Sequence, residues 1–125
     1  MKLIIDRTKW LRGEDDSYLL RSRDNKMCCL GFYCLACGIL EEDIIGKAEP
    51  VELINEEKFS HEKIKNLIIL EYEEGVDLED LDCDNSNVCD QLMSSNDNRK
   101  ITENEREEEI AGLFASIDVD VEFTN

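Results

Sequence analysis

The sequence has little of what catalytic and nucleic-acid-binding chains commonly use. Its 125 residues include one histidine, one proline and 14 lysine or arginine residues, against 31 aspartate or glutamate residues. A single histidine nearly excludes histidine-based catalysis and a multi-histidine metal site. A formal net charge of −17 leaves no basic face to neutralise phosphates, so we expect no direct binding of DNA or RNA.

Long apolar runs are also missing. The longest apolar stretch spans residues 27–40 and is interrupted by Gly31 and Gly38, whereas a membrane helix needs about 20 residues. The apolar run at residues 3–5 is too short for a signal peptide, whose apolar core has about 7–15 residues. We therefore expect a cytoplasmic protein that does not bind membranes and whose cysteines stay mostly reduced.

The charge that is present is unevenly distributed. Residues 1–26 carry seven basic and five acidic side chains, whereas the remaining 99 residues carry seven basic and 26 acidic ones. The apolar fraction of 42% is ordinary for a globular chain. No internal repeat or flexible linker divides the sequence, so we expect one acidic domain covering residues 1–125.

Local patterns predict an α+β fold. Residues 2–6 favour a short strand, and residues 119–123 alternate apolar and acidic side chains, which favours a second strand. Residues 27–37 are apolar all round, as in a central, enclosed helix. A capping box, Thr-Glu-Asn-Glu, opens an amphipathic helix over residues 102–116. We expect the terminal strands to pair in one small sheet packed on these two helices.

The other predicted elements are shorter. Gly31 inside an apolar helix indicates that another backbone passes close to it. Residues 66–72 fit either a helix or a buried strand. The remaining predictions are a helix over 7–12 stopped by Gly13, a strand over 17–22, a turn at Asp24-Asn25, a helical turn over 41–45 closed by Gly46, an element over 49–54, a helix after Ser60, and a helix from 84–87 to Met93.

The cysteines permit three interpretations. Cys34 and Cys37 have the spacing of zinc knuckles and redox motifs, and Cys83 with Cys89 could complete a four-thiolate site. The pair lies in an apolar, helix-like run rather than on a tight turn, and free cysteine packs as a small hydrophobic residue. We therefore favour core packing, with no cofactor, over a metal site or redox chemistry. The six cysteines are Cys28, Cys29, Cys34, Cys37, Cys83 and Cys89.

Catalytic and calcium-binding patterns are weak. An EF-hand-like series of acidic residues begins at Asp82, but Asn87 stands where the loop needs glycine and Met93 where it needs glutamate. His61 lies beside Glu62 in the first turn of a predicted helix, which is typical of a surface residue. The sequence contains no Gly-rich phosphate loop or metalloprotease motif. We expect a protein that is not an enzyme.

The acidic surface is the strongest functional signal. Residues 71–90 carry nine acidic and no basic side chains, and residues 103–122 carry eight acidic side chains and one arginine. Rows of carboxylates attract basic surfaces and can imitate the phosphates of a duplex; alternatively, they only keep a small protein soluble. The predicted partner-binding residues are Glu71, Glu73, Glu74, Asp77, Glu79, Asp80, Asp82, Asp84, Glu105, Glu108 and Glu109.

Six stretches of the sequence form a recognisable set: 5–13, 26–32, 37–38, 102–103, 106–107 and 121–123. Together they resemble a group of small acidic proteins of unassigned function that bacteriophages and prophages encode. The similarity covers most of the chain and is lowest at about residues 46–80. It implies a phage context, in which small acidic proteins often bind host proteins such as restriction and CRISPR nucleases.

These observations predict a phage or prophage accessory protein in the host cell cytoplasm. It would bind and inhibit a host protein with a basic surface, such as a nucleic-acid-binding defence factor, in the manner of anti-CRISPR or anti-restriction proteins. The alternative is a structural or regulatory interaction module without nucleic-acid mimicry, in which Trp10, Tyr18 or Tyr33 forms an apolar contact. A cysteine-based metal-binding protein is a third interpretation.

Overall fold

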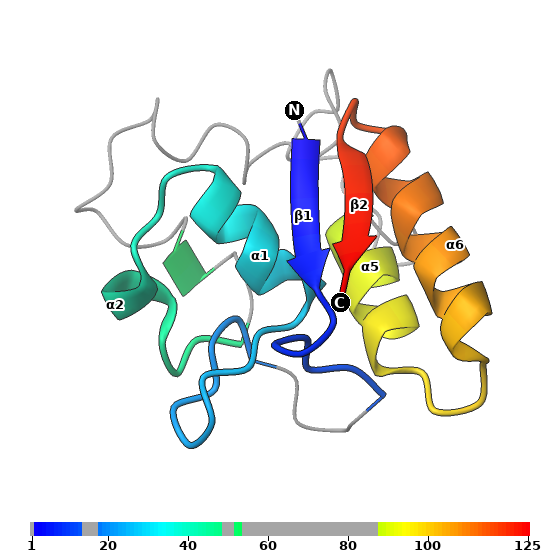
Figure 1. Cartoon of the computed structure of the whole chain (residues 1–125). Helices are drawn as coiled ribbons and strands as arrows, with labels where there is room; N and C mark the ends of the chain where they lie inside the picture. The colour runs from blue at the N-terminus through cyan, green and yellow to red at the C-terminus, as the bar shows by residue number, and fades with distance from the viewer. Residues whose placement is uncertain (1, 14–17, 49–51, 54–87) are drawn as a thin grey trace, which may run out of the picture.

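The computed structural model describes residues 2–13, 18–48, 52–53 and 88–125 (Figure 1). It contains helices and a two-stranded sheet, which confirms the predicted α+β fold. No helix within these ranges is long and apolar enough to cross a membrane. The elements are β1 (Lys2–Asp6), α1 (Cys29–Ala36), α2 (Glu41–Ile44), α5 (Val88–Asp97), α6 (Glu103–Ala115) and β2 (Asp120–Thr124).

The sheet joins the two ends of the chain, as predicted. β1 and β2 are parallel, with Lys2 opposite Asp120 and Ile5 opposite Phe123. Parallel strands need a crossover connection, which the intervening chain supplies. Leu3 and Ile5 are buried, so one face of the sheet covers the core. Figure 1 shows α1 beside β1 and α6 beside β2.

α1 lies at the centre of the core. Its first six residues are all buried, which confirms an apolar helix, although it begins at Cys29 rather than at residue 27. A Cβ atom on Gly31 would lie 1.9 Å from the carbonyl oxygen of Leu19. The close backbone predicted at this glycine is therefore the chain around Leu19. The helix ends before Gly38, whose φ is +90°.

α5 and α6 pack against each other and against the core. Leu92 of α5 and Ile110 and Phe114 of α6 are fully buried. The Thr102 hydroxyl accepts a hydrogen bond from the Glu105 backbone N–H at 3.2 Å and donates to its carboxylate at 3.1 Å. This contact confirms the predicted cap of α6. α5 continues beyond its predicted end to Asp97.

Two predicted elements are wrong. Residues 7–9 form a turn instead of a helix, because the Asp6 side chain accepts a hydrogen bond from the Thr8 N–H at 2.9 Å and Lys9 N–H bonds the Asp6 carbonyl. Such local bonds compete with helix formation. In the described part of residues 17–22, a single bridge between Leu20 and Ile45 replaces the predicted strand.

The predicted turns are confirmed where the structure describes them. Gly13 and Gly46 have φ values of +66° and +78°, and α2 is the helical turn expected before Gly46. Asn25 also has a positive φ of 59° within the predicted turn. Residues 52–53 are helical within the element predicted over 49–54. The predictions for residues 54–87, including the alternatives at 66–72, His61 and the EF-hand-like series up to Asn87, lie outside the described residues.

Candidate functional site: the two faces of α6

The inward face of α6 pairs with the N-terminal segment. The Arg7 guanidinium donates two hydrogen bonds to the Glu107 carboxylate, at 3.1 and 2.7 Å. Arg12 Nε donates to Glu103 at 2.6 Å. These partners are 100 and 91 residues apart in the sequence. Folding therefore neutralises part of the acidic C-terminal region with the basic N-terminal one.

Arg106 completes this inward face as a buried cation, with 2% of its surface exposed. Its guanidinium donates to the Glu103 carboxylate and to the carbonyls of Ser95 and Asn98. These carbonyls lie at the C-terminal end of α5, where backbone acceptors lack helical partners and the helix dipole favours a positive charge. Arg106 is therefore a structural cap that ties α6 to α5.

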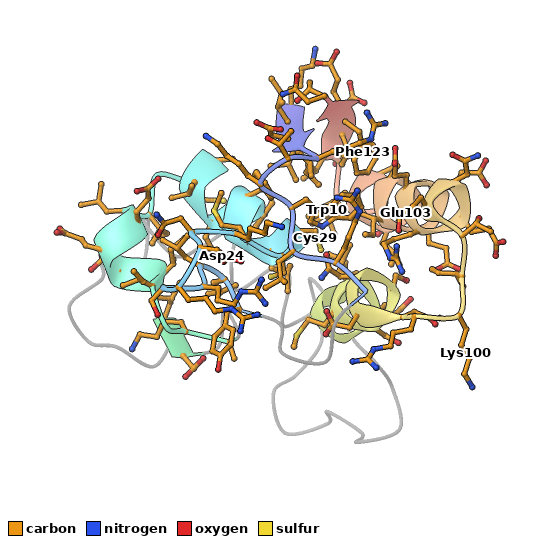
Figure 2. The ribbon with its side chains drawn as sticks, turned by 60° about the horizontal axis from the view of Figure 1, so that its bottom comes forward. Trp10, Asp24, Cys29, Lys100, Glu103 and Phe123 are labelled. Atoms are coloured by element: carbon orange, nitrogen blue, oxygen red, sulfur yellow. The ribbon has the colours of Figure 1, made fainter. Side chains whose placement is uncertain are left out.

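The carboxylate of Glu103, where α6 meets α5 and the N-terminal segment, is held in its ionised form. Its partial burial raises the pKa of Glu103, but the hydrogen bonds from Arg12 and Arg106 outweigh that effect and hold the pKa below its usual value. Figure 2 labels Glu103 on α6 beside Trp10, near the N-terminal segment that supplies Arg12. A carboxylate held in this way contributes to folding, although 55% of the Glu103 side chain is exposed.

Asn96 is the polar centre of the same junction. Its Oδ1 accepts hydrogen bonds from Trp10 Nε1 at 2.7 Å and from the Cys29 backbone N–H at 3.1 Å, and its Nδ2 donates to the Leu11 carbonyl at 2.9 Å. The side chain thus joins the N-terminal segment, the first N–H of α1 and the end of α5. Trp10 and Cys29 lie together at the centre in Figure 2.

The structure corrects part of the alternative interpretation, in which Trp10, Tyr18 or Tyr33 forms an apolar contact with a partner. Trp10 and Tyr33 are buried. The Trp10 ring is tilted against Phe123, with centroids 5.3 Å apart, and the Tyr33 ring stacks on Phe114 at 5.6 Å. Neither side chain is available to a partner in this structure. Tyr18 is half-buried.

The outward face of α6 presents Glu105, Glu108 and Glu109, and all three are exposed. Their i, i+3 and i, i+4 spacing places them on one side of the helix. Within the described part of the chain no lysine or arginine forms an ion pair with them. Glu109 accepts a hydrogen bond from the Ser95 hydroxyl at 2.9 Å. The face therefore keeps three unneutralised carboxylates.

An open hollow of about 510 Å³ adjoins these carboxylates. Glu108, Glu109 and Gly112 of α6 line one side, and Gln91 and Ser94 of α5 line the other. A Cβ atom on Gly112 would meet nothing within 4 Å. The surface beside the carboxylates can therefore admit a side chain from a partner.

The predicted partner-binding residues divide into two sets. Glu105, Glu108 and Glu109 lie together on α6, as their helical spacing predicted. The other eight, Glu71, Glu73, Glu74, Asp77, Glu79, Asp80, Asp82 and Asp84, lie outside the described residues. The sequence interpretation missed Asn96 and the structural role of Arg106. The isolated position of Arg106 among acidic residues, three after Glu103, was the available signal for it.

The described cysteines pack in the core, as predicted. Cys28, Cys29 and Cys34 are buried. Burial raises the pKa of the Cys29 and Cys34 thiols well above the usual value, so both stay protonated at neutral pH and are poor nucleophiles. No group of three potential metal ligands occurs in the described ranges. A site using Cys83 or the Cys89 side chain lies outside what the structure describes.

No protein-family model, curated protein or solved structure matches this chain. The resemblance to small acidic phage proteins therefore stays a prediction. The function has to be argued from the surface chemistry of the chain itself.

Proposed function

We propose that this protein is a non-enzymatic binding protein that attaches to a basic surface of a partner through the outward face of α6. The observation that carries this proposal is the division of the α6 glutamates. Glu103 and Glu107 are paired with arginines, whereas Glu105, Glu108 and Glu109 are exposed and have no basic partner among the described residues. Like charges at this spacing destabilise a helix by about 0.2–0.5 kcal/mol per pair, and a basic partner would relieve that repulsion.

The more specific proposal concerns the partner. We propose a host nucleic-acid-binding defence factor, inhibited in the host cytoplasm by a phage or prophage accessory protein. The net charge of −17 supports it, because a strongly acidic surface attracts clefts that hold phosphates. The resemblance to phage proteins supports it as well.

The test compares two variants with the same charge change. Glu105→Gln, Glu108→Gln and Glu109→Gln together remove three charges from α6, and Asp118→Asn, Asp120→Asn and Glu122→Gln remove three from the β2 region. Immobilised wild type and variants are mixed with host lysate at about 50 and about 500 mM salt. Captured proteins are identified by mass spectrometry and assayed for nucleic-acid binding.

We expect wild type and the β2 variant to capture the same partner at low salt, and high salt to release it, since attraction between exposed charges is screened. The α6 variant should capture much less, and the captured protein should lose its nucleic-acid binding when wild type is added. Equal capture by the α6 variant across the salt range would contradict a role for this face.

The acidic block outside the described residues needs its own variant. Glu73→Gln, Glu74→Gln, Asp77→Asn and Asp80→Asn together remove four charges while keeping size and polarity. If residues 71–84 contribute to docking, this variant should lose partner affinity, and its melting temperature should stay level or rise because self-repulsion falls. Unchanged affinity across the salt range would leave α6 as the docking surface.

A further inference from the structure

A second surface of different character lies beside β1. A groove of about 850 Å³ runs between β1 and the α1–α2 region, on the other side of the sheet from α6 (Figure 1). Ile4 of β1, Leu35 of α1 and Ile45 after α2 line it. Ile4 and Ile45 are 52% and 43% exposed, which is unusual for large apolar side chains. The groove therefore leaves large apolar side chains exposed among polar and charged ones.

The backbone of β1 has no partner along this groove among the described residues. Arg7 N–H donates to the Thr124 carbonyl at 2.9 Å, and in a parallel pair every second residue directs both its N–H and its C=O to the partner strand. Leu3, Ile5 and Arg7 therefore face β2, whereas the N–H and C=O of Ile4 point away from it. No described residue forms a backbone hydrogen bond with Ile4 on that side. β1 thus has an open edge.

The rim of the groove is mainly acidic, which favours a basic partner segment. Asp6, Asp24, Glu41 and Glu42 line it, and among the described lining residues Lys9 is the one basic side chain. Glu41 and Glu42 are exposed in the first turn of α2. An acidic segment would be repelled at this rim, and a helix would leave the edge of β1 unpaired.

We propose that the groove and the open edge of β1 bind an extended segment of a partner protein in which apolar residues alternate with lysine or arginine. The segment adds a third strand beside β1, with main-chain hydrogen bonds to Ile4. Its apolar side chains cover Ile4 and Ile45, and its basic side chains meet Glu41 and Glu42. This surface is separate from the outward face of α6 and does not depend on it.

The probe is a synthetic peptide of about eight alternating lysine and valine residues, a common strand length, blocked at both ends. There are two control peptides. The first has glutamate in place of lysine. The second has N-methyl groups on alternate residues, so its backbone cannot form the hydrogen bonds to the edge of β1. Binding to the full chain is measured by fluorescence polarisation. We expect the lysine peptide to bind at least tenfold tighter than either control.

The matched protein variants are Ile4→Pro and Ile4→Val. Proline removes the outward N–H of Ile4 and is tolerated on an edge strand, whereas valine keeps the N–H and the apolar side chain. We expect Ile4→Pro to weaken peptide binding at least tenfold and Ile4→Val by less than threefold. Glu41→Gln with Glu42→Gln should weaken binding at about 50 mM salt and have little effect at about 500 mM.

Hydrogen exchange in the unmodified chain avoids any folding defect of the proline variant. The Ile4 amide should exchange at least tenfold more slowly when the lysine peptide is bound. The proposal fails if the N-methylated peptide binds as tightly, if Ile4 exchange is unchanged by the peptide, or if no peptide binds. It also fails if the lysine peptide no longer binds the variant with Glu105→Gln, Glu108→Gln and Glu109→Gln but still binds Ile4→Pro. That result would leave the proposal for α6 intact.

Discussion

The two faces of α6 use the same residue type for different purposes. On the inward face, Glu103 and Glu107 accept hydrogen bonds from Arg12, Arg106 and Arg7. On the outward face, Glu105, Glu108 and Glu109 remain exposed and unneutralised in the described structure. Sequence composition counts all five as one acidic block. The structure separates carboxylates that are paired with arginines from carboxylates that have no basic partner among the described residues.

This difference changes how an acidic surface should be interpreted. A net charge of −17 describes the whole chain, but the inward carboxylates are screened by arginines from the N-terminal segment. On α6, the outward carboxylates keep the stronger field toward a basic partner. Variants of the two faces should therefore change stability in opposite directions.

The largest effect is expected for Arg106→Ala. The change leaves Glu103 without its buried partner and the carbonyls of Ser95 and Asn98 without a donor. Arg106 is buried, and each backbone acceptor left unpaired by its removal costs about 1–3 kcal/mol, so we expect a loss of about 3 kcal/mol. Urea denaturation of Arg106→Ala and Arg106→Lys provides the measurement. A loss below about 1 kcal/mol for alanine would mean that the junction does not anchor α6.

A smaller effect is expected for Glu107→Gln. Its partner Arg7 is half-exposed, and paired surface charges contribute about 0.2–1 kcal/mol. We expect a destabilisation within this range that diminishes as salt is added, because the pair is screened. Arg7→Gln should give the same loss, and the double variant should add little to it. Additive losses would contradict a direct pair between these residues.

The pH dependence of stability should reveal Glu103. Because the folded carboxylate has a lowered pKa, its stabilisation is present above the usual glutamate pKa of about 4.3. That stabilisation is lost as the pH falls through the lowered folded value. The difference in unfolding free energy between wild type and Glu103→Gln should therefore shrink between about pH 6 and about pH 3.

Arg12→Gln provides the matched control for this pH dependence. It removes the donor while leaving the Glu103 carboxyl in place, so it should flatten the same part of the pH profile. A constant difference between wild type and both variants across this range would show that the Arg12–Glu103 contact does not lower the pKa.

Features determined by neighbouring residues could be predicted from the sequence. The alternation at 119–123, the capping residue Thr102 and the turn glycines each act within a few residues, so their patterns sufficed. Gly31 was also informative, because a glycine inside an apolar helix needs a reason and close backbone packing is a common one. The outward positions of Glu105, Glu108 and Glu109 followed from helical spacing.

Features determined by distant residues could not be predicted in this way. Asn96 contacts Trp10 across 86 positions of the sequence, and nothing near Asn96 distinguishes it from a surface asparagine. The short helix expected over 7–12 was wrong because the Asp6 side chain favours a turn and Trp10 pairs with Met27. The open edge of β1 depends on the parallel pairing and its register, which local patterns do not determine.

The most direct test of the difference between the two faces compares two charge-matched variants. Glu103→Gln with Glu107→Gln changes the inward face, and Glu105→Gln with Glu108→Gln changes the outward face, each removing two charges. We predict a lower melting temperature for the inward pair. For the outward pair we predict an unchanged or slightly higher melting temperature, because relieved repulsion stabilises the helix by about 0.2–0.5 kcal/mol. Equal destabilisation by both pairs, measured by calorimetry at the same salt concentration, would contradict the division of α6 into structural and partner-accessible faces.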